Sequence, residues 1–130
     1  MNILGEYLAK EGVQKTQAAS RRVRVIFNST TIVDSTEGVF VWEHPWYPHY
    51  YFPSSEIRNA NVEEAKGGAS PVRLTVAARP ENGIEERSTE RVLRFSASAQ
   101  PTQLAGLIRL EFSAMGRASM AKFSVFDYWS

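Results

Sequence analysis

The sequence predicts a mostly β fold, a compact antiparallel barrel or sandwich with a short helix near its N-terminus. Apolar and polar residues alternate in several short segments after residue 21, a period of two that is typical of half-buried strands. Turn-forming residues such as Asn28-Ser29 and Glu81-Asn82-Gly83 separate these segments. Residues 2–16 instead place apolar side chains at helical spacing.

The elements follow in order along the chain. Gly12 limits the length of the N-terminal helix. We expect this helix to pack on the edge of the domain or to form a partly ordered arm. The first three strands are expected to form an antiparallel meander, and the later strands to complete the fold. A flexible loop is expected over residues 63–71 and a hairpin turn at Glu81-Asn82-Gly83. The expected strands cover residues 22–27, 30–33, 38–43, 72–78, 91–95, 104–112 and 123–126.

Size and charge restrict the function classes. The chain has 130 residues, which fits one domain, with a helix or arm over residues 1–20 and a β domain over residues 21–130. Its 15 basic and 14 acidic residues give a net charge of +1, so we expect neither nucleic acid nor a membrane as partner. No apolar run is long enough for a secretory signal or a membrane span, and we expect a cytoplasmic protein.

The chain contains no cysteine, which excludes disulfides, thiolate nucleophiles and cysteine-ligated zinc. The two histidines, His44 and His49, lie five residues apart in a loop-like segment and would need distant carboxylates to hold a metal. We therefore expect no metal and no cofactor.

Residues 44–53 are the densest chemical feature of the sequence. They read His-Pro-Trp-Tyr-Pro-His-Tyr-Tyr-Phe-Pro, with five aromatic residues and two histidines among ten. The three prolines argue against a helix or a central strand over most of this segment. Glu43 lies directly before it, at the expected end of a strand.

Several motifs resemble those of a known family. They are the run Arg22-Val23-Arg24-Val25-Ile26-Phe27-Asn28, then Ile32-Val33-Asp34-Ser35, Trp42-Glu43 and Tyr51-Phe52-Pro53, with looser matches at Lys66-Gly67-Gly68-Ala69-Ser70 and from Gln100-Pro101 to Phe112. The family that these motifs resemble is domain-of-unknown-function family 427. The chain looks like a longer variant, in which a proline- and aromatic-rich insertion separates Glu43 from Tyr51. The similarity covers about residues 21–115.

This resemblance implies a small fold of the β-tent type and no established reaction. The ligand-binding domain of cereblon and methionine sulfoxide reductase B share that architecture. The chain departs from the family's pattern at three positions. Glu63 stands where the family often has Cys, Pro71 where Tyr often follows Ala-Ser, and Leu93 where Trp is frequent. Activities that depend on those groups are therefore not implied for this chain.

The residues around Glu43 suit acid/base chemistry. A carboxylate enclosed by aromatic side chains is easier to protonate, because desolvation disfavours its charged form, and an imidazole titrates near neutrality. Glu43 with His44 or His49 would exchange protons with a substrate, and Tyr47 or Tyr51 would donate to a developing oxyanion. The sequence thus predicts a cofactor-independent isomerase, cyclase or lyase that acts on a small, partly aromatic carbonyl compound.

Ligand-binding side chains are expected on the same loop and strands. Trp42 and Trp46 would sandwich a planar ligand. The expected set is Arg24, Trp42, Trp46, Tyr50 and Phe52.

Other interpretations stay open. The aromatic residues also suit a packed plug over one end of the fold, with Glu43 in a structural ion pair with Arg22 or Arg24. Another alternative is a non-catalytic module that binds a small ligand or peptide in an aromatic cage. Alternatively the chain is a structural protein whose aromatic loop is buried in a homodimer. Glu43 inside a closed cavity favours catalysis, whereas Glu43 paired with arginine beside an open aromatic groove favours binding.

Overall fold

The computed structural model describes residues 3–19, 21–46, 48–111 and 124–128. Most of the described elements are strands, and all their pairings are antiparallel. The elements are α1 (Ile3–Glu11), β1 (Lys15–Ala18), β2 (Arg22–Phe27), β3 (Thr30–Ser35), β4 (Val39–Trp42), β5 (His49–Pro53), η1 (Ser54–Glu56), β6 (Asn61–Val62), β7 (Ala69–Val76), η2 (Pro80–Asn82), β8 (Arg87–Phe95), η3 (Thr102–Leu104), β9 (Leu107–Leu110) and β10 (Ser124–Tyr128).

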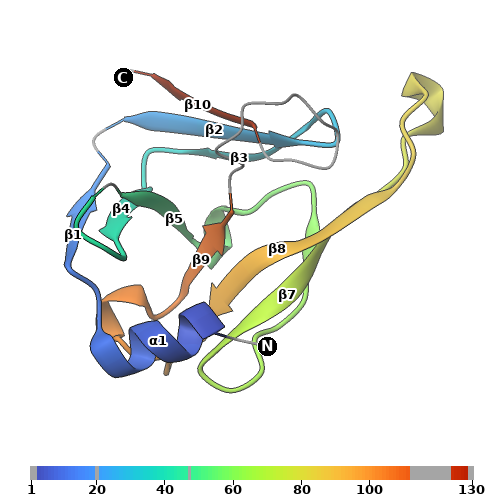
Figure 1. The fold of residues 1–130 in the computed structure, drawn as a ribbon. Helices are drawn as coiled ribbons and strands as arrows, with labels where there is room; N and C mark the ends of the chain where they lie inside the picture. Colours follow the sequence, from blue (N-terminus) through green and yellow to red (C-terminus); the bar gives the residue numbers. More distant parts are fainter. Residues whose placement is uncertain (1–2, 20, 47, 112–123, 129–130) are drawn as a thin grey trace.

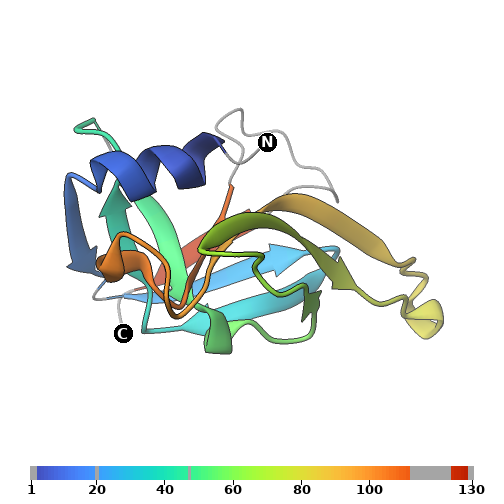
Figure 2. The ribbon, with the colours of Figure 1, turned by 90° about the horizontal axis from the view of Figure 1, so that it is seen from below.

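The described strands form two sheets. The large sheet has the order β1-β4-β5-β9-β8-β7-β6, and the small sheet has the order β10-β2-β3. Figure 1 shows the small sheet on one side of the large sheet and α1 on the other, and Figure 2 shows the same layers after a quarter turn. The predicted sandwich-like β fold with a short N-terminal helix is therefore confirmed, and the described strands do not close into a barrel. None of the described helices has the length and apolarity that crossing a membrane requires.

The pleat of the large sheet assigns alternate residues to its two faces. In β5, Phe52 pairs with Ile108 of β9, and both side chains pack in the core against the small sheet. Tyr51, one residue earlier, pairs with Arg109 and packs in a second core, which contains the fully buried Leu8 of α1. The two faces of β5 therefore have different surroundings, and this difference determines how the candidate site is built.

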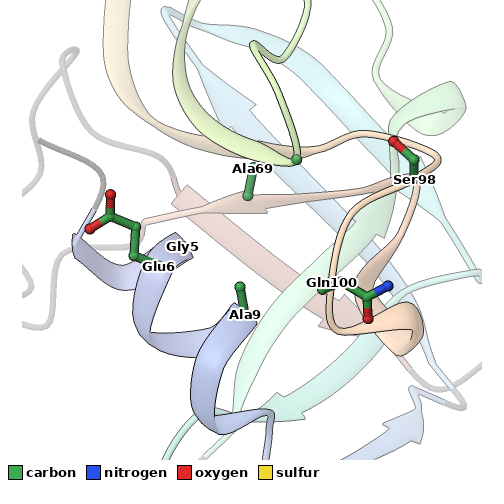
Figure 3. A pocket seen from close by; sticks show the side chains of 7 residues that line it. Gly5, Glu6, Ala9, Ala69, Ser98 and Gln100 are labelled. Atoms are coloured by element: carbon green, nitrogen blue, oxygen red, sulfur yellow. The ribbon is translucent and has the colours of Figure 1, made fainter.

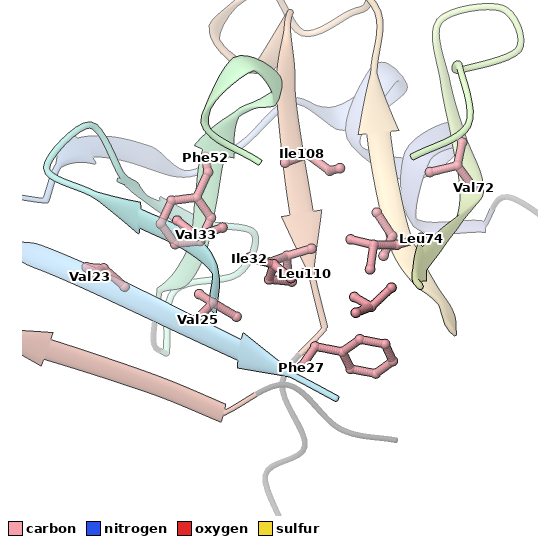
Figure 4. Packing of buried hydrophobic residues seen from close by; sticks show 12 residues of the cluster. Val23, Val25, Phe27, Ile32, Val33, Phe52, Val72, Leu74, Ile108 and Leu110 are labelled. Carbon is pink, nitrogen blue, oxygen red and sulfur yellow. The ribbon is translucent and has the colours of Figure 1, made fainter. Parts of the chain in front are cut away.

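The main core lies between the two sheets. Figure 4 shows how side chains of β2 and β3 pack against those of the large sheet. Its buried members are Val23, Val25, Phe27, Ile32, Val33, Phe52, Val72, Leu74, Val76, Val92, Ile108 and Leu110. The second core, under α1, consists of Leu8, Val41, Tyr51, Leu93, Phe95, Ala99 and Leu104. Removal of this apolar surface from water is the main stabilising contribution.

The turn between β2 and β3 contacts the connection between β7 and β8 of the large sheet. Asn28 and Ser29 both adopt left-handed backbone angles (φ 54° and 58°), as a two-residue hairpin turn requires. The Asn28 side chain is buried and donates a hydrogen bond from Nδ2 to the carbonyl oxygen of Glu85 at 2.8 Å. Glu85 belongs to the long connection between β7 and β8, whose hairpin projects from the body of the molecule in both views (Figures 1 and 2). The predicted turn is confirmed, and it also anchors this projecting hairpin.

The expected pairing of the first three strands was wrong. The first three expected strands do not form one meander, because β4 leaves β3 and joins the large sheet. The backbone N–H of Arg58 donates to the carbonyl oxygen of Ile32 at 2.8 Å, and Asn59 Nδ2 donates to that of Thr31 at 2.9 Å. These contacts occupy the edge of β3 that a third strand would have used.

The prolines of residues 44–53 do not prevent a central strand. Pro45 and Pro48 precede β5, and Pro53 is its last residue. No proline therefore removes a donor from the middle of the strand. Likewise Pro71 lies within β7, opposite Leu93 of β8, in a stretch that β6 does not reach. Strand β1 was not expected at all, because its side chains are mostly exposed and show no apolar alternation.

We expect Leu74→Ala to lower the free energy of unfolding by about 2–5 kcal/mol, because it removes a fully buried side chain from the main core. Chemical denaturation of the purified protein measures this change. The matched control is Arg73→Ala, at the exposed neighbouring position, where we expect a change within about 0.5 kcal/mol. Equal effects of the two substitutions would contradict the assigned core.

Candidate functional site

Alternation along β5 divides the aromatic residues of the predicted site between two faces of the large sheet. His49 pairs with Val41 and lies, like Tyr51, on the α1 side. Tyr50 and Phe52 lie on the opposite side and pack against the main core. The structure thus separates the predicted residues into a polar group and an aromatic group.

Glu43, directly after β4, is the centre of the polar group. Its side chain is 5% exposed. Tyr51 Oη donates a hydrogen bond to Glu43 Oε2 at 2.6 Å. Arg109 Nε donates to the same oxygen at 2.6 Å, and Arg109 Nη2 donates to Oε1 at 3.2 Å. Both carboxylate oxygens are therefore held by charge-assisted hydrogen bonds. We call Glu43, Tyr51 and Arg109 the carboxylate cluster.

Arg109 is the functional candidate that sequence reasoning missed. It stands opposite Tyr51 because β5 pairs with β9, and neither β5 nor this pairing was expected. Burial disfavours the guanidinium charge, but the hydrogen bonds and the charge of Glu43 prevail and raise the pKa of Arg109 above its ordinary value. For Tyr51, burial and the adjacent Glu43 carboxylate raise the pKa of the phenol far above its ordinary value. Arg109 therefore stays charged and Tyr51 stays protonated at neutral pH.

The expected arginine partners of Glu43 lie elsewhere. Arg22 Nε and Nη2 each donate to Asp34 at 2.7 Å, and Arg24 Nη2 reaches the same carboxylate at 3.5 Å. The hydrogen bonds from Arg22, together with the charges of both arginines, lower the pKa of Asp34 to about 2. Arg24 faces away from the main core, because its neighbours along β2 fill that core. The small sheet therefore separates this predicted ligand-binding residue from Glu43.

His49 lies over the carboxylate cluster. Its Nε2 is 3.5 Å from Glu43 Oε1, its Nδ1 is 3.5 Å from Arg109 Nη2, and its side chain is 24% exposed. Burial is the main cause that lowers the pKa of His49 below the ordinary 6.5; Glu43 opposes this shift and Arg109 adds to it. His49 is therefore neutral at pH 7.

The loop before β5 adds two more rings beside His49. The ring of His44 lies 5.6 Å from that of His49 and 4.9 Å from that of Trp46, measured between ring centroids. The backbone N–H of Trp46 donates to His44 Nδ1 at 3.4 Å. Trp46 is 78% exposed. Tyr47, the remaining predicted catalytic residue, lies outside the described residues.

The aromatic group forms a row on the other face of the sheet. Phe40 stacks edge-on to Trp42 at 6.3 Å and lies 5.0 Å from Tyr50, which stacks on Phe52 at 6.1 Å. Lys15 Nζ lies 4.7 Å from the centroid of the Trp42 ring. Phe40, Trp42 and Tyr50 are only half-buried, whereas Phe52 is fully buried. We call these three half-buried residues the aromatic row; Trp46 belongs to the other group, beside His44.

A pocket of about 390 Å³ lies between α1 and the loops that flank β7 and β8. Figure 3 shows that small side chains line much of it, with Glu6 on one side and Ser98 and Gln100 on the other. It contains no member of the carboxylate cluster or the aromatic row. Within the described part of the chain, no three His, Cys, Asp or Glu side chains are placed to hold a metal ion.

A family profile with the description Domain of unknown function (DUF427) matches residues 15–73. This match confirms the resemblance that the motifs indicated as far as residue 73, and it extends from β1 into β7. It includes Glu43, His49 and Tyr51 but ends before Arg109. No curated protein and no solved structure matches the chain.

We expect Arg109→Met to lower the free energy of unfolding at pH 7 by about 3–5 kcal/mol, because Glu43 would remain buried without its counter-charge. The double variant with Glu43→Gln should recover much of this loss, since it removes that charge as well. Tyr51→Phe serves as the milder control and should cost about 1–3 kcal/mol. Chemical denaturation of the wild type, both single variants, the double variant and Tyr51→Phe provides these comparisons. A loss in the double variant equal to the sum of the losses of Arg109→Met and Glu43→Gln alone would show that the pair is not coupled.

We expect His49 to titrate below pH 6.5 in the folded protein, which NMR of the imidazole signals measures directly. Below that pH the unfolded chain binds more protons than the folded chain at this position. The free energy of unfolding therefore falls as the pH falls through 6.5 towards the folded pKa. His49→Gln should flatten this part of the stability curve, and His44→Gln should leave it in place. A titration above 6.5 would contradict the burial of His49.

Proposed function

We propose that this chain, with its family match over residues 15–73, is a cytoplasmic, non-catalytic module that binds a small, partly aromatic molecule. One observation carries the proposal: both oxygens of the buried Glu43 carboxylate, the expected acid or base, accept hydrogen bonds from Arg109 or Tyr51. The paired-arginine arrangement is the one that favours binding over proton transfer.

A general base needs a lone pair within reach of the substrate's proton. In Glu43 both oxygens already accept hydrogen bonds, and the side chain is 5% exposed. Removing Arg109 from the carboxylate to admit a substrate would leave two buried charges unpaired, which is strongly unfavourable. In this proposal the carboxylate cluster is a structural anchor that ties the residue after β4 to the middle of β5 and to β9.

The aromatic row provides the binding surface in this proposal. Its half-buried rings come from adjacent strands, β4 and β5, which hold them at fixed spacing. Aromatic rings bind planar ligands by offset or edge-on stacking, and they contribute large apolar area with little loss of side-chain freedom. Lys15 over Trp42 shows that this ring also accepts a positive charge on its face. The ligand class supported here is a small planar molecule with a polar substituent.

A second candidate is the cofactor-independent acid/base enzyme, and His49 is the observation that favours it. A neutral imidazole that is partly exposed can take a proton from a substrate, and Glu43 at 3.5 Å would stabilise the resulting imidazolium. In this alternative Glu43 positions the imidazole of His49 and balances its positive charge, and His49 accepts the proton from the substrate. His44 and Trp46 would then line the substrate side of the ring.

Acetophenone in D₂O separates the two candidates, because it is a small aromatic ketone whose α-protons exchange only when an acid or base assists. Backbone amide NMR shifts report its binding, and loss of its α-proton signal reports catalysis. We expect Trp42→Leu to weaken binding about tenfold, and the matched Trp46→Leu to leave it nearly unchanged.

Under the binding proposal, acetophenone exchanges its α-protons at the rate of buffer alone. Accelerated exchange that His49→Gln abolishes would instead establish the enzyme. Binding that is insensitive to Trp42→Leu would remove the aromatic row as the site.

A further inference from the structure

A second pocket lies at the opposite end of β5 from His49. Its walls come from Ser54 after β5, Gly106 before β9, the loop after β6 and the end of β8 with the residues that follow it. Because a strand rises about 3.3 Å per residue, the three steps from Tyr51 to Ser54 place it roughly 10 Å along β5 from the carboxylate cluster. Its volume is about 300 Å³, at the small end of the range for ligand sites. None of the residues that line it belongs to the aromatic row or to the carboxylate cluster, so the pocket is separate from the site of the proposed function.

Backbone hydrogen bonds fix the walls of this pocket. The N–H of Ser54 donates to the carbonyl oxygen of Gly106 at 3.0 Å. The N–H of Gly106 donates to Phe95 and Ser96 carbonyl oxygens at 3.2 and 3.1 Å, and the N–H of Ser96 donates to that of Gly68 at 2.8 Å. A pocket built this way is preformed and needs little reorganisation to bind.

Arg94 is the cationic side chain that lines the pocket. Its Nη1 donates to the carbonyl oxygens of Glu63 and Val62, at 3.0 and 3.4 Å. These neutral acceptors orient the guanidinium but leave its charge in place. The Glu64 carboxylate lies 3.6 Å from Nη2. The Glu64 side chain is 88% exposed, whereas that of Arg94 is 21% exposed.

The Arg94–Glu64 pair has the geometry of a displaceable contact. It is long, one partner is almost fully solvated, and such pairs contribute little to stability. An incoming carboxylate can take the place of Glu64 and pair with the guanidinium in its preferred fork geometry. Ala65 and Ala97 supply apolar wall beside it.

Ser54 adds a second polar group. Its hydroxyl oxygen is buried and has no hydrogen-bond partner among the described residues. A buried hydroxyl without a partner is unfavourable. Rotation of this side chain towards the pocket would let a bound ligand satisfy it.

We propose that this pocket binds a small carboxylic acid with a short apolar body, whose carboxylate displaces Glu64 from Arg94. The ligand's apolar part contacts Ala65 and Ala97. Glu64 acts as an internal competitor that lowers the affinity of the empty pocket for anions. The inference does not depend on the proposed function, since it concerns other residues at the other end of β5.

Butyrate, butyramide and inorganic phosphate are the probes, and the backbone amide shifts of Ser96, Ala97 and Gly106 are the readout. We expect butyrate to bind and butyramide, which has the same shape without the charge, to bind at least about tenfold more weakly. Glu64→Gln should tighten butyrate binding about threefold, because it removes the competitor. Arg94→Gln should abolish it.

Glu63→Gln is the matched control, since it removes the same charge from the same loop without freeing Arg94. Equal effects of Glu63→Gln and Glu64→Gln would overturn the competitor role. Equal binding of butyrate and butyramide, or binding of phosphate without butyrate, would overturn the ligand class. The Glu64→Gln comparison stands even when Arg94→Gln fails to fold.

Discussion

Strand β5 imposes the main constraint on this molecule, because it lies inside the large sheet with a packed layer on each side. Its side chains must alternate between the two layers. His49 and Tyr51 therefore join the polar group under α1, and Tyr50 and Phe52 join the aromatic group against the small sheet. Neighbouring residues of β5 therefore lie on opposite faces of the large sheet. They cannot contact the same ligand while the strand is intact.

Burial of the Glu43 carboxylate is unfavourable, and the fold offsets this cost with hydrogen-bond donors from neighbouring strands. Glu43 follows β4, its hydrogen-bond donors come from β5 and β9, and these three strands are consecutive in the large sheet. Each donor is placed by strand register rather than by a mobile loop. The hydrogen-bonded carboxylate of Glu43 thereby links the end of β4 to β5 and β9. Because Arg109 and Tyr51 donate hydrogen bonds to both oxygens of Glu43, we favour binding over catalysis. An acid/base alternative must turn to His49.

Local patterns predicted the fold class and several elements. The alternation of Val23, Val25 and Phe27 and the Asn28-Ser29 turn are decided by residues within a few positions of each other, so the sequence shows them directly. The partner of Glu43 is different. Arg109 is 66 positions away, and only the register between β5 and β9 brings it into contact. A prediction based on nearby arginines chose Arg22 and Arg24, which instead neutralise Asp34.

Strand β1 has a consequence for the edge of the large sheet. It pairs with β4 from Lys15 to Ala18, and its side chains are polar and mostly exposed. In this position it covers the backbone edge of β4 (Val39–Trp42), a strand that is apolar and rich in strand-forming residues. A chain shortened past Ala18 would present that edge as an open hydrogen-bonding template, the kind of surface on which proteins stack into aggregates. The short polar segment after α1 therefore protects the protein's solubility as well as completing its architecture.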